Sequence, residues 1–183
     1  MTSSKSTDLP DQILLGRAIQ GDAEAFGDIY EQHLEEILRY VFYRVANRFE
    51  AEDLTETVFL KAWEALPRFE SSRVNLRAWL YRIAHNVVVD HYRTRKATAA
   101  LSDVSLRDDH PLPEQRVQTR EQNQQLALAI QSLNANLQNV IICRFINGLS
   151  HSETAQIMGL REGHVRVLQH RALKKLRQWL EKE

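Results

Sequence analysis

Residues 151–177 read HSETAQIMGLREGHVRVLQHRALKKLR, and this stretch has the spacing of a helix-turn-helix. Ala155 is small enough for two helices to approach closely, and Gly159, four residues later, suits the positive φ of a tight turn. Val165, six residues further on, is predicted to anchor the second helix from beneath. The other inward positions are expected to be Ile157, Met158, Leu160 and Leu168.

The second helix of this motif carries many more basic than acidic side chains. Its only acid is Glu162, and its polar residues are Arg161, His164, Arg166, Gln169, His170, Arg171, Lys174, Lys175 and Arg177. A helix with this charge, held at the angle of a helix-turn-helix, suits the major groove of DNA. The alternative is a packed helical hairpin with a solvated basic face. Because spacing and charge agree, the sequence favours DNA binding.

The bulk composition indicates a folded protein with no membrane insertion and a cytoplasmic location. The 183 residues suit one large or two small domains, and 43% of them are hydrophobic. No run of eighteen apolar residues exists, and the N-terminus lacks the apolar stretch of a secretory signal. No residue follows Glu183, so we expect no appended regulatory domain. The single cysteine, Cys143, lies in the apolar run VIICRF and is expected to be a buried structural thiol.

Charge is segregated along the chain although the net charge is zero. Residues 20–36 contain six acids and no lysine or arginine: Asp22, Glu24, Asp28, Glu31, Glu35 and Glu36. Residues 73–96 contain one acid, Asp90, and six bases: Arg73, Arg77, Arg82, Arg93, Arg95 and Lys96. This distribution predicts one surface for phosphates and another for a different partner.

Hydrophobic periodicity predicts helices throughout the chain. The predicted helices cover residues 11–20, 22–47, 50–66, 75–95, 121–133, 135–147, 151–158 and 162–181. Residues 97–120 contain two prolines and no sustained apolar period, which is typical of a linker. The sequence therefore predicts an all-α fold of two small helical domains, 1–96 and 121–183, joined by the flexible linker 97–120.

The predicted helix over residues 75–95 has two contrasting faces. Leu76, Trp79, Leu80, Ile83, Val87 and His91 fall on one side, whereas Arg82, His85, Asn86, Val89, Arg93 and Lys96 fall on the other. The second set combines cations with amide and imidazole groups and suits contacts to a phosphate backbone and to bases. A solvated helix face is the alternative. The loop before this helix, 67–75, contains small polar residues that suit an unstacked base.

Three motifs in this order resemble a known family. They are AEDLTETVFLKAWEALPRF at 51–69, NLRAWLYRIAHNVVVDHYRTRK at 75–96, and LNANLQNVIICRFINGLSHSETAQIMGLREGHVRVLQHRALKKL at 133–176. Together they resemble the extracytoplasmic-function (group four) class of bacterial sigma-70 factors, which keeps sigma regions two and four. The resemblance covers roughly 22–96 and 121–180. It implies an alternative sigma factor that binds core RNA polymerase and directs promoter recognition and transcription initiation.

The resemblance also implies roles for individual positions. The residues that would contact polymerase are Glu52, Asp53, Leu54, Glu56, Phe59 and Trp63. The residues that would open and read the minus-ten element are Arg68, Ser71, Arg73, Asn75, Arg82, Asn86, Asp90 and Arg93. The residues that would contact the minus-thirty-five element are Arg161, His164, Arg166, Gln169, His170, Arg171 and Lys174.

The partners implied by the family are core RNA polymerase, through its β′ clamp helices and its β flap, promoter DNA and an anti-sigma factor. No cofactor, metal or catalytic residue is expected. The chain departs from the family at Thr55-Glu56-Thr57, where Thr-Gln-Glu is frequent, and at Thr154, where isoleucine is usual. His164 and the run 167–169 also differ, which affects the expected promoter sequence and not the class.

Two rival interpretations are weaker. Glu52 and Glu56 share a helix face, and paired carboxylates can hold a divalent metal in a nuclease, but no third ligand cluster with matching spacing accompanies them. A stand-alone two-domain helix-turn-helix transcriptional regulator is the better rival. It would need an effector pocket or a dimer interface, and the sequence indicates neither.

Overall fold

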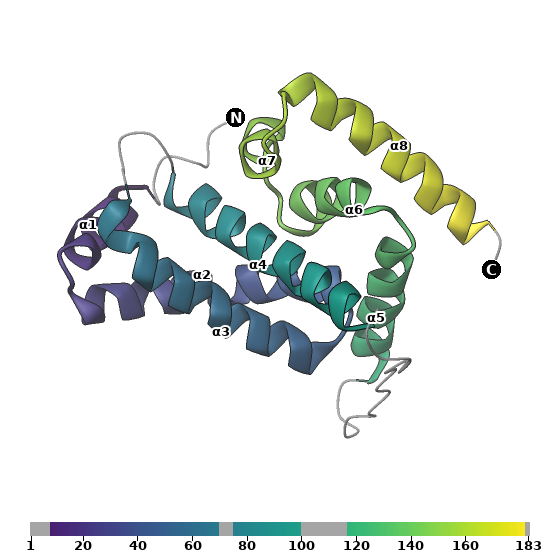
Figure 1. The fold of residues 1–183 in the computed structure, drawn as a ribbon. Helices are drawn as coiled ribbons and strands as arrows, with labels where there is room; N and C mark the ends of the chain where they lie inside the picture. Colours follow the sequence, from purple (N-terminus) through teal and green to yellow (C-terminus); the bar gives the residue numbers. More distant parts are fainter. Residues whose placement is uncertain (1–7, 70–74, 100–116, 182–183) are drawn as a thin grey trace.

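The computed structural model describes residues 8–69, 75–99 and 117–181, and within these ranges the secondary structure is helical, with no strand. The elements are α1 (Asp8–Ile19), α2 (Ala23–Val45), α3 (Arg48–Ala65), the short 3₁₀ helix η1 (Leu66–Arg68), α4 (Leu76–Ala99), α5 (Val117–Gln131), α6 (Ala135–Ile141), the π-helical turn η2 (Ile142–Ile146), α7 (His151–Met158) and α8 (Glu162–Leu180). The all-α prediction is confirmed, and Figure 1 shows the arrangement.

Polar side chains set the beginnings of these helices. The Asp22 carboxylate accepts hydrogen bonds from the backbone N–H groups of Glu24 and Ala25, both at 3.1 Å, and so caps α2. Asn47 and Asn134 cap α3 and α6 in the same way, with one bond each at 3.1 Å. These caps satisfy N–H groups that a helix start leaves without a partner, and therefore fix where each helix begins.

Helices α1 to α4 form an N-terminal unit in which α3 and α4 pack on α2. Ile29, Ile37 and Val41 of α2, Val58 of α3 and Leu80 of α4 are at most 1% exposed. The run of β-branched residues in α4 is compatible with the helix because Val87 and Val88 pack into this apolar core. The expected helix over 75–95 is confirmed and extends to Ala99.

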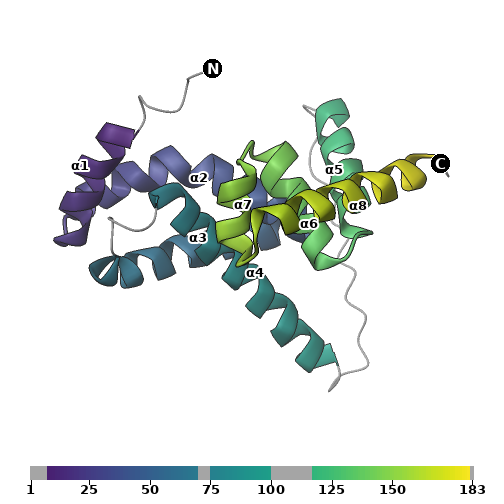
Figure 2. The same ribbon diagram turned by 90° about the horizontal axis from the view of Figure 1, so that it is seen from above.

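Helices α5 to α8 form a C-terminal unit in which α6 packs against α8 and α7 packs against α8. Cys143 in η2 is fully buried, as expected, and burial raises the pKa of its thiol to about 12. In both views α8 is the outermost layer of this unit, away from the N-terminal helices (Figures 1 and 2). Its solvent-facing side is therefore open along most of its length.

The two units pack on each other, and the sequence did not predict this. Helix α2 contacts α5 and η2, and α4 contacts α7, so that one hydrophobic cluster includes residues of both units. Figure 2 shows α7 and α6 lying over the helices of the N-terminal unit. The predicted linker, 97–120, falls mostly outside the described residues. The contact between the units brings α4 and the helix-turn-helix side by side.

Candidate nucleic-acid and polymerase interfaces

The turn between α7 and α8 has the predicted helix-turn-helix geometry. Gly159 has φ +64°, and the N–H of Leu160 donates to the carbonyl of Ala155 at 2.9 Å, which closes the end of α7. Ala155 is 6% exposed and Val165 is fully buried, so both occupy the inward positions expected of them. Helix α7 begins with a capping box between Ser150 and Glu153.

The solvent face of α8 is a row of basic side chains. The exposed members are Arg161, His164, Arg166, His170, Arg171, Lys174, Lys175 and Arg177. Arg166 pairs with Glu162 at 2.5 Å, but its side chain is 65% exposed. An exposed i,i+4 ion pair contributes little stability, so it does not keep Arg166 from another partner. Arg177 pairs in the same way with Glu181 at 3.0 Å.

Gln169 lies beside the core and not in this exposed row. It is half-buried, and its Oε1 accepts a hydrogen bond from Nε of Arg144 at 3.2 Å and lies 3.0 Å from Nε2 of His151. Because arginine only donates, the amide oxygen of Gln169 must face Arg144. This oxygen is therefore engaged within the C-terminal unit, and Gln169 joins α8 to the start of α7.

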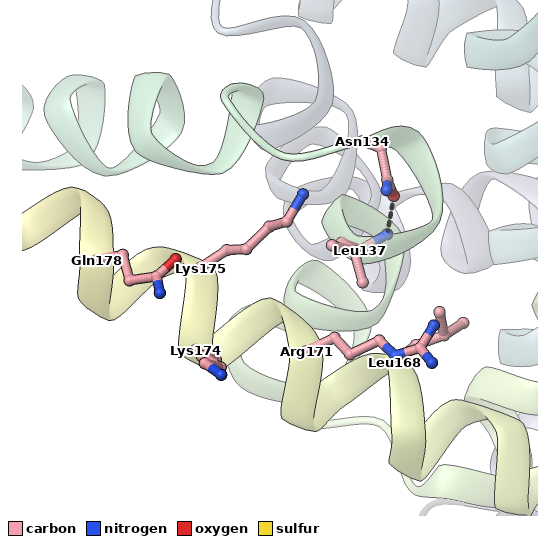
Figure 3. A pocket seen from close by; sticks show the side chains of 7 residues that line it. All are labelled: Asn134, Leu137, Leu168, Arg171, Lys174, Lys175 and Gln178. Carbon is pink, nitrogen blue, oxygen red and sulfur yellow. Dashed lines mark hydrogen bonds between the residues drawn. The ribbon is translucent and has the colours of Figure 1, made fainter.

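A shallow hollow of about 460 Å³ lies beside α8, against the turn between α5 and α6 (Figure 3). Leu137 and Leu168 form its apolar floor, and the remaining lining residues are polar: Asn134, Arg171, Lys174, Lys175 and Gln178. The close-up shows Arg171 about one turn before the adjacent Lys174 and Lys175 of α8, with Lys175 extended toward the loop that carries Asn134. The basic character of α8 thus continues into this hollow.

The second predicted basic face is partly present on α4. Arg82, Asn86 and Arg93 are exposed, and Val89 is 43% exposed. Asp90 pairs with Arg93 at 3.2 Å on the same helix. These side chains form a polar surface that is open to solvent.

The segment before α4 supplies two more of the expected residues. Arg68 and Asn75 are exposed, and Oδ1 of Asn75 accepts a hydrogen bond from the N–H of Arg77 at 2.8 Å. Asn75 therefore also supports the start of α4. Ser71 and Arg73, which were expected to contact the minus-ten element, lie outside the described residues.

His85, which was predicted for the basic face of α4, lies elsewhere, and this prediction is wrong. Arg77, which was counted among the bases of residues 73–96, is engaged within the protein. His85 faces the C-terminal unit, where its Nδ1 lies 3.2 Å from Nδ2 of Asn139. Arg77 donates to the Glu36 carboxylate at 2.8 Å and to the carbonyl of Asn147 at 3.0 Å. Burial alone would raise the pKa of Glu36, but the hydrogen bond from His33 and the charge of Arg77 hold that pKa below its usual value. Arg77 is therefore paired and not free to bind phosphate.

Helix α3 exposes part of the predicted polymerase-contacting set. Asp53 and Glu56 are exposed, whereas Glu52 pairs with Arg48 at 2.5 Å and Leu54 is half-buried. Leu60 is 59% exposed one turn beyond Glu56. The sequence analysis did not name Leu60. The signal that could have identified it is that this leucine lies off the inward i, i+3, i+4 positions of α3 and is therefore expected at the surface. The surface is an acidic patch beside an exposed leucine.

The two aromatic residues of that set lie beneath this surface. Phe59 is 3% exposed and contacts Tyr30 edge to face, with ring centroids 4.7 Å apart. Trp63 is half-buried against Phe26, with centroids 5.0 Å apart. Both rings join α3 to α2, so their contribution is to hold the exposed side chains of α3 in place.

The described ranges contain no group of three or more side chains suited to hold a metal ion. Within the same ranges, none of the helices combines the length and apolar character that spanning a bilayer requires.

Comparison with known proteins identifies the family. The family model "Sigma-70 region 2" matches residues 29–98, and "Sigma-70, region 4" matches residues 129–178. The ECF RNA polymerase sigma factor BldN of Streptomyces coelicolor is 36% identical over 166 residues, which are 89% of this chain and 63% of BldN. This chain therefore spans somewhat less than two thirds of BldN.

Two solved structures resemble the whole arrangement. CnrH in complex with the cytosolic domain of CnrY has a TM-score of 0.76 at 27% identity, covering 95% of this chain and 99% of CnrH. RpoE of Bartonella quintana in complex with the anti-sigma factor NepR has a TM-score of 0.68 at 26% identity, covering 84% and 97%. The match to region 2 falls within the N-terminal unit, and the match to region 4 falls within the C-terminal unit, beginning near the end of α5. The chain belongs to the sigma-70 family, and its relatives place it in the extracytoplasmic-function class of RNA polymerase sigma factors.

Proposed function

We propose that this protein is an alternative sigma factor that binds core RNA polymerase and directs it to promoters. The observation that carries the proposal is the helix-turn-helix of region 4, whose recognition helix α8 exposes basic side chains along most of its length. Region 2 adds a second exposed polar face on α4 and an acidic patch on α3. A sigma factor needs two DNA contacts and a polymerase contact, and these three surfaces suit those roles.

On α8 we assign base contacts to Arg166 and His170 and backbone contacts to Arg171 and Lys174. Arginine can pair bidentately with guanine, which is worth about 1–3 kcal/mol of discrimination. Arg166→Ala should therefore relax the preference at one or two minus-thirty-five positions. Lys174→Ala should weaken binding evenly and reduce the salt dependence by about one phosphate contact. Arg177→Ala, a similarly exposed arginine near the end of the same helix, is the matched control.

Selection from a randomised minus-thirty-five library with each mutant holoenzyme tests these assignments. We expect an altered motif only with Arg166→Ala. If that variant returns the wild-type motif, Arg166 contacts the backbone and the assignment within α8 is wrong.

On α3 we assign polymerase contacts to Asp53 and Glu56, with Leu60 beside them. Removing charge at a desolvated contact costs about 2–5 kcal/mol, so Asp53→Ala with Glu56→Ala should reduce binding to core polymerase by more than tenfold while helicity is retained. The matched control removes two exposed acids from α2, Glu31→Ala with Glu35→Ala. Equal affinities of the two double variants for core polymerase would show that the acidic patch on α3 faces solvent and does not contact polymerase.

The β′ clamp helices and the β flap are the polymerase elements we propose as contacts, and an anti-sigma factor is the further partner we propose. The RpoE relative is seen with an anti-sigma factor, and its arrangement covers most of this chain. We also propose that the protein contributes binding surfaces and no catalytic group. The segregated charges of regions 2 and 4 suit several partners at once.

Run-off transcription with purified core polymerase on a library of genomic fragments tests the proposal as a whole. We expect promoter-specific transcripts that require this protein. A stand-alone regulator would instead give specific nanomolar binding by the free protein at physiological salt. A gel shift that shows such binding without polymerase would refute the proposal.

A further inference from the structure

Gln169 occupies a boundary position on α8, between the buried side of the helix and its exposed basic row. Val165 and Ala172 face inward and are fully buried, whereas Arg166 and His170 are exposed. Gln169 is half-buried, and Arg166, proposed above as a base contact, lies about one turn before it. An amide at such a boundary can bond inward, outward or both. The directions of its oxygen and its nitrogen therefore decide its role.

The amide oxygen of Gln169 is fully used inside the C-terminal unit. Its Oε1 accepts a hydrogen bond from Nε of Arg144 at 3.2 Å and lies 3.0 Å from Nε2 of His151. Because this oxygen can only accept, the His151 contact requires a proton on Nε2, so that both nitrogens donate to the same atom. A carbonyl oxygen has two acceptor positions, and these two donors occupy both. Gln169 therefore has no acceptor left for another molecule.

The two donors are themselves held in place by separate elements. The guanidinium of Arg144, in η2, also donates to the carbonyl of Leu149, a fully buried residue. His151 is the first residue of α7, and a capping box fixes the start of that helix. Turning the amide of Gln169 over would place its N–H groups against Arg144, which has no acceptor to offer them. The amide is therefore fixed in one orientation.

The amide nitrogen of Gln169 has no partner among the described residues. No hydrogen bond within the described ranges involves Nε2 of Gln169, and this nitrogen does not belong to the buried polar atoms that lack a partner. It is therefore open to solvent, where it carries two N–H groups. Toward another molecule, Gln169 acts as a donor alone.

This restriction limits what Gln169 can recognise in DNA. Glutamine reads adenine by donating to N7 and accepting from the N6 amino group, and the second bond needs a free amide oxygen. Gln169 cannot make that pair, because Arg144 and His151 occupy its oxygen. What remains is a hydrogen-bond acceptor of DNA, either a phosphate oxygen or an acceptor on a base edge.

The place of Gln169 in the motif favours a phosphate oxygen. Helix α7 packs beside the first turns of α8, and Gln169 is bonded to the residue that begins α7 (Figure 1). In a helix-turn-helix the first helix crosses the sugar-phosphate backbone, while the exposed face of the second helix enters the groove. Glutamine side chains are among the groups that donate to phosphate in such complexes.

We infer that Arg144 and His151 hold the amide of Gln169 with its nitrogen toward DNA, and that this nitrogen donates to a phosphate oxygen of the minus-thirty-five element. The orientation is a property of the free protein, whereas the phosphate contact rests on the proposed sigma function. Gln169 then fixes how α8 sits in the groove and does not choose a base. Arg144 and His151 act through Gln169 and are positioning residues, although neither lies on the recognition helix.

Urea unfolding of the free chain tests the orientation through a double-mutant cycle. The variants are Arg144→Met, Gln169→Met and both together, because methionine keeps an unbranched side chain without its N–H donors or amide oxygen. We expect the effects to couple by about threefold or more in the unfolding equilibrium constant, since each single change already removes the shared bond. Gln178→Met replaces Gln169→Met in the matched control cycle, because Gln178 is exposed on the same helix, and should not couple.

Additive effects of Arg144→Met and Gln169→Met would refute the fixed orientation. If Arg144→Met does not fold, His151→Phe takes its place in the cycle, because it removes the other donor to the same oxygen. Far-UV circular dichroism shows whether each variant keeps its helices.

Promoter binding by the holoenzyme tests the phosphate contact. The promoter carries one methylphosphonate at a time across the minus-thirty-five element, which removes the charge and one oxygen of a single phosphate. We expect Gln169→Met to bind the unmodified promoter about threefold to tenfold more weakly, the range of one neutral hydrogen bond. At one phosphate, the modification should weaken wild type more than it weakens Gln169→Met. Gln178→Met is the control and should match wild type at every phosphate.

Additive effects at every phosphate would refute the phosphate contact. Selection from a randomised minus-thirty-five library separates the two kinds of acceptor, and we expect Gln169→Met to return the wild-type motif. A motif relaxed at one position would show that the nitrogen donates to a base, which overturns the phosphate assignment. If wild-type holoenzyme gives no promoter-specific transcripts, the proposed function fails together with the phosphate contact, while the unfolding cycle still decides the orientation.

Discussion

Val165 and Val167 allow the buried side of α8 to be tested separately from its exposed side. The same Val→Ala change can be made at both positions, which are only two residues apart. Val165 is fully buried, whereas Val167 is 47% exposed. Replacing either valine with alanine alters the intrinsic helix propensity equally. The difference between the two variants therefore measures burial alone.

The expected loss at Val165 follows from its burial. Val165→Ala removes two buried carbons, worth about 0.8 kcal/mol each, and a residual cavity adds up to about 1 kcal/mol. The free energy of unfolding should fall by about 1.5–3 kcal/mol. Val167→Ala should change it by no more than about 0.5 kcal/mol.

Urea unfolding followed by far-UV circular dichroism gives both values, and promoter binding by each holoenzyme gives the functional comparison. We expect Val165→Ala to lose stability and Val167→Ala to keep it. Equal losses at the two positions, or a larger loss at Val167, would refute the placement of the inward face of α8 and with it the orientation of the basic row.

Two further outcomes are expected from α4. Asn86→Ala should leave the melting temperature of the protein nearly unchanged, because the side chain is exposed. It should reduce the permanganate reactivity of the minus-ten region, which reports promoter opening. A variant with a lowered melting temperature and normal promoter opening would show that the inward and outward faces of α4 are inverted. Burial, followed by the nearby charge of Arg44, lowers the pKa of His85 from its usual 6.5 in the folded protein. The unfolded chain then binds the proton more readily, so the contribution of a neutral His85 to stability should be present above about pH 6.5 and lost as the pH falls through the lowered pKa. Urea unfolding at about pH 7.5 and about pH 5.5 on wild type and His85→Gln tests this. Tyr40 and Asn139 face the ring, and the same loss of stability in both proteins would exclude His85 as its source.

Much of the fold could be predicted because it depends on neighbours along the chain. Ala155, Gly159 and Val165 defined the helix-turn-helix through spacing, and the exposed row of α8 followed from helical periodicity. On α4 the same method succeeded for Arg82 and Asn86, which are exposed.

The failures on α4 have a different physical cause. Tyr81, Ala84 and Val88 are fully buried although they lie off the predicted inward face, because α4 packs against α2 and α3 and also contacts α7. His85 was predicted as a DNA contact because it falls on the same helix face as Arg82 and Asn86, yet it meets an asparagine 54 residues away. Contacts between distant residues leave no periodic pattern, so the interface between regions 2 and 4 could not be predicted from spacing.

The chemistry of the contact between the two units has a consequence for how the protein responds to ionic strength. Every ion pair in the described ranges lies within a single unit. Hydrogen bonds that cross between the units end on uncharged acceptors, as from Arg39 to the side chain of Asn147 and from Arg77 to its carbonyl. Screening by salt acts most strongly between exposed opposite charges, so a rise in salt should weaken the proposed contact of α8 with phosphates more than the contact between the units.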